Sequence, residues 1–84
     1  MRAEDFLPEH ENRMQTPDGQ VVRKGTIGAF LVNAQIWGDP HTTSAAQADV
    51  ERDIIGALPA LRSLGLFDIC TARNEALQRL IEAH

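Results

Sequence analysis

The stretch that decides the fold runs from Gly25 to Gly38 and reads GTIGAFLVNAQIWG, without a single charged residue. Within it, apolar side chains recur at the spacing of one helical face: Ile27, Phe30, Leu31, Ala34 and Trp37. Val32 and Ile36 place apolar groups on a second face. We therefore predict a helix that either is buried on both faces or shares one of them with a partner.

Boundary signals mark both ends of this helix and the start of the next. Thr26 can cap its N-terminus, and Gly38-Asp39-Pro40 can end it, because glycine suits a C-cap and proline blocks continuation. Ser44-Ala45-Ala46-Gln47 has the pattern of a capping box for a second helix. That helix is expected to run to about Leu58, after which Pro59 either kinks it or begins a new short helix.

A third helix is predicted at the end of the chain. Gly65 is expected to end the second helix in a left-handed conformation, with Leu66 making the apolar contact that accompanies such an ending. Asp68 or Thr71 is predicted to cap the last helix, whose apolar stripe carries Leu77, Leu80, Ile81 and His84. We expect five side chains from the three helices to be almost fully buried: Leu31, Ile54, Leu61, Leu77 and Leu80.

Residues 12–23 are predicted to form a small β-hairpin. Pro17-Asp18-Gly19 is turn chemistry, since proline presets φ, aspartate bonds nearby backbone and glycine accepts a positive φ. Met14 and Thr16 on one side and Val21-Val22 on the other can supply the strands. A hairpin of this size is marginal alone, so it must pack on the helices.

Length and composition bound the architecture. The chain has 84 residues, a net charge of −4, 43% hydrophobic residues and 24% charged residues, as expected for one ordinary globular domain. We predict a flexible tail over residues 1–11 and a single small helical domain over residues 12–84. The predicted fold is mainly α, with three helices, the second broken at Pro59, and a short N-terminal β-hairpin.

Several turn and helix-boundary motifs occur together along residues 14–68: Pro17-Asp18-Gly19, Val22, Gly25-Thr26-Ile27, Leu58-Pro59-x-Leu61 and Gly65-Leu66-Phe67-Asp68. This set resembles a family of short uncharacterised bacterial proteins, a domain of unknown function. The resemblance implies a bacterial source and supplies no catalytic residues.

Charge and composition disfavour several classes of function. An acidic chain lacks the basic surface with which proteins usually neutralise nucleic-acid phosphates or bind anionic membranes. The charge-free stretch of residues 25–38 is shorter than the ~20 residues that a membrane-spanning helix needs. Cys70 is the single cysteine, so no internal disulfide can form. We expect a cytoplasmic protein that does not contact membranes.

Enzymatic chemistry finds little support in the sequence. The histidines, Cys70 and Asp39 show none of the spacings that place two ligands on one metal ion. Asp39, His41 and Ser44 have the residue types of a hydrolase triad, but they lie in one loop and more simply form a turn and a helix cap. Cys70 has no nearby histidine as a base and is more simply a small buried hydrophobe. We expect a non-enzymatic protein without cofactor or metal.

Two binding functions remain. The first is self-association or binding of a protein partner through the apolar helix, with Phe30 and Trp37 as interface residues, since aromatic side chains often anchor interfaces. An equally favoured interpretation places Trp37 in the core of the single chain. A homodimer is the commonest arrangement. The alternative is a helix-turn-helix-like nucleic-acid-binding protein that reads bases with polar residues of the last helix: Arg73, Asn74, Gln78 and Arg79. Glu75 and Glu82 offset the two arginines, which makes nucleic acid the less favoured partner.

Overall fold

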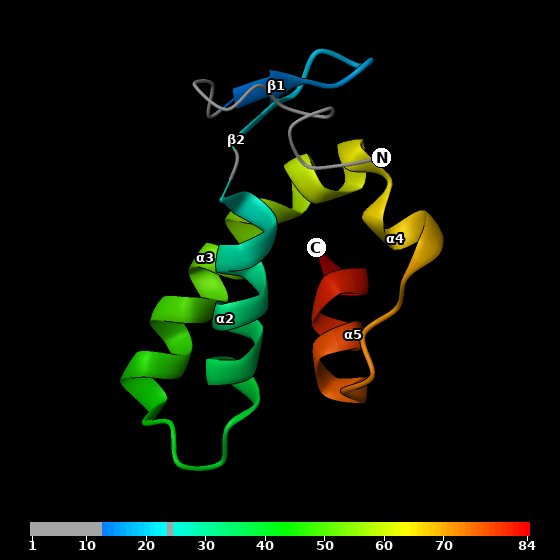
Figure 1. Ribbon diagram of the computed structural model, residues 1–84. Coiled ribbons are helices and arrows are strands. Elements are labelled where there is room, and N and C mark those ends of the chain that lie inside the picture. The colour runs from blue at the N-terminus through cyan, green and yellow to red at the C-terminus, as the bar shows by residue number, and fades with distance from the viewer. Residues whose placement is uncertain (1–12, 24) are drawn as a thin grey trace.

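The computed structural model describes residues 13–23 and 25–84 (Figure 1). Within these residues two short strands precede four helices, and their bounds are β1 (Arg13–Gln15), β2 (Val21–Arg23), α2 (Thr26–Gly38), α3 (Ser44–Leu64), α4 (Leu66–Ile69) and α5 (Glu75–Ala83). The predicted mainly helical class is confirmed. The expected flexible tail of residues 1–11 lies outside the described residues.

The helices surround one small core. α2 and α3 lie side by side, and α5 lies beside α2 after the chain has turned through α4 (Figure 1). The buried core residues come from all three long helices: Phe30, Ile54, Leu58, Leu61, Leu77 and Ile81. Arg62 of α3 further holds α5, because its guanidinium donates to the main-chain oxygens of Ile81 at 2.7 Å and His84 at 3.1 Å.

The N-caps of α2 and α3 each lie one residue before the position that the sequence predicts. Gly25 is the N-cap of α2 and Thr26 is already helical, so the prediction of a threonine cap there is wrong. Thr43 caps α3, because it adopts the extended conformation of a cap and its Oγ1 accepts from the Ala46 N–H at 3.2 Å. The predicted capping box is not made, since the side-chain amide of Gln47 donates to the Trp37 carbonyl at 3.0 Å.

α3 is continuous from Ser44 to Leu64, so the helix is not interrupted at Pro59 and the alternative that Pro59 begins a new helix is wrong. Proline removes one backbone donor from the helix interior. Pro59 nevertheless lies on the exposed side, while Leu58 and Leu61 beside it are buried in the core. Their packing keeps the chain helical, and the ribbon of α3 bends on its way to α4 (Figure 1). Gly65 then ends the helix with φ 86°, which confirms the predicted left-handed residue.

The last helix begins later than its predicted caps. A short helix that the sequence analysis did not predict, α4, occupies Leu66–Ile69, and Cys70 follows it in an extended conformation. The cap of α5 is Asn74, whose Oδ1 accepts from the Leu77 N–H at 3.1 Å. Asp68 and Thr71 are therefore not the cap, because Asp68 lies within α4 and Thr71 lies in the segment that follows α4, three residues before Asn74.

The predicted core is right for Ile54, Leu61 and Leu77, only partly right for Leu80, and wrong for Leu31 in α2. Ile54 and Leu61 are fully buried, Leu77 is buried, and Leu80 is half-buried against the core. Leu31, by contrast, is 52% exposed. α2 packs through the preceding residue, Phe30, whose ring meets the Phe67 ring edge-to-face with centroids 6.1 Å apart.

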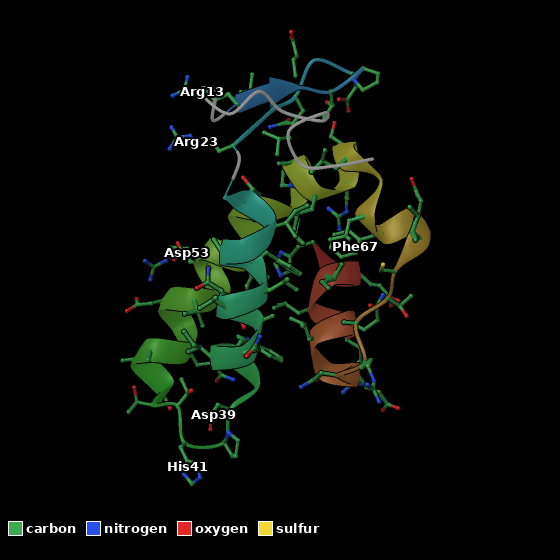
Figure 2. All side chains as sticks on the ribbon, in the orientation of Figure 1. Arg13, Arg23, Asp39, His41, Asp53 and Phe67 are labelled. Atoms are coloured by element: carbon green, nitrogen blue, oxygen red, sulfur yellow. The ribbon has the colours of Figure 1, made fainter. Side chains whose placement is uncertain are left out.

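β1 and β2 pair antiparallel, with Arg13 opposite Arg23 and Gln15 opposite Val21. Figure 2 shows the two arginine side chains on the same side of the strand pair. Gly19 has φ 89°, which confirms the positive φ expected of it, and its N–H donates to the Thr16 carbonyl at 2.9 Å. Val22 and Thr16 are buried, so this segment packs on the rest of the chain.

Candidate functional site

The surface that distinguishes this molecule is the exposed apolar part of α2. Four of its large apolar side chains are well exposed: Ile27 at 41%, Leu31 at 52%, Val32 at 57% and Ile36 at 37%. The helix contains no charged residue. Single exposed apolar residues are ordinary, but several gathered on one uncharged helix make this helix the candidate interaction surface.

Three sides of α2 can be told apart by their neighbours. Phe30 points into the core. Leu31, Ala34 and Gln35 line a hollow of about 830 Å³ that α2 shares with α4, α5 and the segment between them. Ala29 and Asn33 line a second hollow of about 420 Å³ that also borders β2 and α3.

The remaining side of α2 faces neither hollow. It carries Gly28, Val32 and Ile36, all exposed and spaced by four residues. We call these three residues the outer row. Because residues four apart are neighbours on the surface of a helix, the outer row forms one apolar ridge that runs at an incline to the axis of α2.

The two interface residues predicted from the sequence hold the fold together instead. Phe30 is only 6% exposed, so it offers almost no surface to a partner. Trp37 is half-buried against the core, and its Nε1 donates to Glu51 Oε1 of α3 at 3.0 Å. The sequence pattern showed two apolar faces on this helix, but only the packing on α3 reveals that Phe30 and Trp37 belong to the inner one.

The hollow beside α5 has an apolar lining that includes Leu31, Leu66, Phe67, Leu77 and Ile81. Cys70 also lines it and is exposed, so the prediction of a buried cysteine is wrong. Among the described residues, no histidine lines this hollow that could act as a base for the thiol. Cys70 also lies four residues before the cap of α5, outside the first turn of that helix.

The residues of the nucleic-acid hypothesis divide into two kinds. Asn74 caps α5, and Gln78 accepts from the Ala72 N–H at 2.7 Å while donating to Glu82 at 3.2 Å. Their side chains therefore organise the start of α5. Arg73 and Arg79 are exposed. The element before α5 is the four-residue α4, whereas a helix-turn-helix places a full helix there.

The loop with Asp39, His41 and Ser44 is a turn. Asp39 Oδ1 accepts from the main-chain N–H of His41 at 2.8 Å, not from its ring. Asp39 directly follows α2, and His41 lies at the tip of the loop (Figure 2). Ser44 begins α3 as an exposed residue. Within residues 13–23 and 25–84, no group of three or more histidine, cysteine or carboxylate side chains lies where it could hold a metal ion.

Comparison with models of known protein families, with curated proteins and with solved structures finds no match. The resemblance to short bacterial proteins therefore stays a prediction from the sequence. Among the described helices, none combines the length and the hydropathy that crossing a membrane requires.

Proposed function

We propose that this protein is a small non-enzymatic interaction protein of the bacterial cytoplasm that self-associates through the exposed apolar face of α2. The observation that carries the proposal is the exposure of Leu31 and Val32, 52% and 57%, on a helix without charge. In the isolated chain these side chains remain in water, and a second copy is the commonest partner that covers such a surface.

Sedimentation equilibrium over about 10 µM to 1 mM tests this proposal. We expect the mass to rise with concentration from 9.3 kDa toward twice that value. Val32→Glu should abolish the rise, because it places a charge in the interface. Ala48→Glu, the same change at an exposed position of α3, is the matched control and should leave the rise intact. A mass of 9.3 kDa at every concentration would overturn the proposal.

A nucleic-acid-binding function is the alternative, and the exposure of Arg73 and Arg79 is what favours it. The engagement of Asn74 and Gln78 in hydrogen bonds around the start of α5 speaks against base reading by these two residues. Fluorescence anisotropy of a labelled DNA duplex at low salt, with Arg73→Ala and Arg79→Ala as variants, distinguishes the two. Binding that weakens in both variants and with added salt would support the alternative.

A further inference from the structure

The side chains of the outer row increase in size along α2, so the row is complementary to its own reverse. Val32 stands at its centre, with Gly28 four residues before it and Ile36 four residues after it. A Cβ built at Gly28 would meet nothing within 4 Å, so the backbone there is open to an approaching chain. Ile36, at the other end, presents a large side chain that is 37% exposed.

We propose that two copies of the chain pair antiparallel through α2, about a twofold axis at Val32. This inference rests on the proposed self-association and specifies its geometry. In this arrangement Val32 meets the partner's Val32. Gly28 then lies opposite the partner's Ile36, so the large side chain fills the space left by the missing one, twice in each dimer.

A parallel pairing lacks this fit. It sets Gly28 against the partner's Gly28, which leaves a gap, and Ile36 against the partner's Ile36, which crowds the other end. Ridges formed by residues four apart also interlock between helices whose axes come within roughly 8–10 Å. The absence of a side chain at Gly28 permits that approach.

The charge distribution favours a second copy over a charged partner. The outer row and all of α2 lack charge, whereas the exposed surface of α3 carries Asp49, Arg52 and Asp53. A charged partner surface placed on α2 would lose water without gaining a counter-charge. An identical uncharged helix meets no such penalty, and a twofold interface uses the same surface on both chains.

Cysteine cross-linking tests the geometry in a Cys70→Ser background, which removes the exposed native thiol. Three single variants are compared, Gly28→Cys, Val32→Cys and Ile36→Cys. An antiparallel pair places two copies of position 28 about 12 Å apart along the helices, since each lies four residues from the axis. That separation exceeds the ~7 Å limit between the Cα atoms of a disulfide.

We therefore expect Val32→Cys to form a covalent dimer on mild oxidation, and Gly28→Cys and Ile36→Cys to do so only when the two variants are mixed. Ala48→Cys, exposed on α3, measures collisional cross-linking and should stay at background. Cross-links in each single variant would show a parallel pair, which overturns this inference and leaves self-association standing. A mass that rises with concentration, without any cross-link at position 32, would likewise overturn the antiparallel geometry and leave self-association standing. A monomer at every concentration would overturn both.

A second set of variants needs no oxidation. Gly28→Ile should raise the dimer Kd at least tenfold, because the new side chain meets the partner's Ile36. The fold should persist, since the position is open in the single chain and isoleucine is a better helix former than glycine. Adding Ile36→Ala should restore much of the affinity, because the smaller alanine of the partner leaves room for the isoleucine at position 28. Failure of this rescue, with both variants folded by circular dichroism, would contradict the antiparallel register.

Discussion

The Ser63 hydroxyl of α3 donates a hydrogen bond to Asp18 Oδ1, and so joins the turn between the two strands to a helix 45 residues further along the chain. Thr16 donates to the same carboxylate oxygen, and its Oγ1 lies 2.8 Å from Ser63 Oγ. Thr16 is almost fully buried, at 4% exposed. The turn is therefore fixed to α3 by a polar cluster as well as by the burial of Val22.

This cluster makes the stability of the protein depend on pH. The hydrogen bond from Ser63, followed by those from Thr16 and the Gln20 N–H, lowers the pKa of Asp18 below its ordinary 3.8. A pKa that is lower in the folded state contributes stability that is present above the unfolded value and is lost as pH falls through the folded value. Thermal melts between about pH 2 and pH 7 should show this loss below about pH 4.

Asp18→Asn separates this effect from general acid unfolding. The variant should melt at a lower temperature than the wild type at neutral pH and should lose less of its stability on acidification, because it has no carboxylate to protonate at this position. Asp53→Asn, at an exposed position of α3, is the control and should follow the wild type. An identical acid profile for Asp18→Asn and the wild type would contradict the prediction.

The turn also depends on Gly19. Its φ of 89° lies in the region that strains residues with a Cβ, so Gly19→Val should cost about 1–2 kcal/mol. Gly56→Ala is the matched control, because that glycine lies in α3 without a positive φ and a Cβ there meets nothing within 4 Å. It should stabilise the protein by up to about 1 kcal/mol. Equal unfolding free energies for both variants in urea would show that the turn bears no strain.

Local backbone chemistry was the part that the sequence predicted well. Gly19 and Gly65 adopt positive φ as expected, because no other residue type takes that conformation as easily. The helix caps were predicted one or more residues away from their true positions. Several neighbouring residues can serve as caps, and the choice between Thr43 and Ser44 depends on which of them has the extended backbone.

Tertiary packing decided two features that local sequence patterns do not contain, the continuity of α3 and the buried side of α2. Pro59 remains inside α3 because Leu58 and Leu61 are buried on either side of it, and no local pattern contains that information. The predicted apolar stripe of α2 includes both Phe30 and Leu31. Because α2 has apolar groups on two faces, the sequence alone does not show which of these two residues is buried. The structure places Phe30 inside, and this places Val32 and Ile36 on the outside, which is the surface proposed for self-association.

This assignment changes the expected cost of core substitutions. Leu31→Ala should cost less than about 1 kcal/mol of unfolding free energy, since Leu31 is 52% exposed and its removal leaves no buried cavity. Ile54→Ala should cost roughly 2–5 kcal/mol, because Ile54 is completely buried. Urea unfolding at low protein concentration, where the chain is monomeric, measures both. A cost for Leu31→Ala as large as for Ile54→Ala would mean that Leu31 is covered.

Trp37 gives the sharpest separation between folding and association. The sequence favoured the interface and the core equally for this residue. Trp37 packs against the core, and its Nε1 donates to Glu51 Oε1 at 3.0 Å. Trp37→Ala should therefore lower the unfolding free energy by roughly 2 kcal/mol, through lost packing and an unpaired carboxylate. At concentrations where the variant stays folded, its dimer Kd should change less than twofold, since the indole does not belong to the outer row.

Glu51→Gln keeps an acceptor for the indole N–H and is the control, with a much smaller loss of stability. Calorimetry and sedimentation equilibrium on the same samples measure the two quantities. A Kd that rises more than tenfold while the melting temperature stays constant would return Trp37 to the interface and remove it from the core.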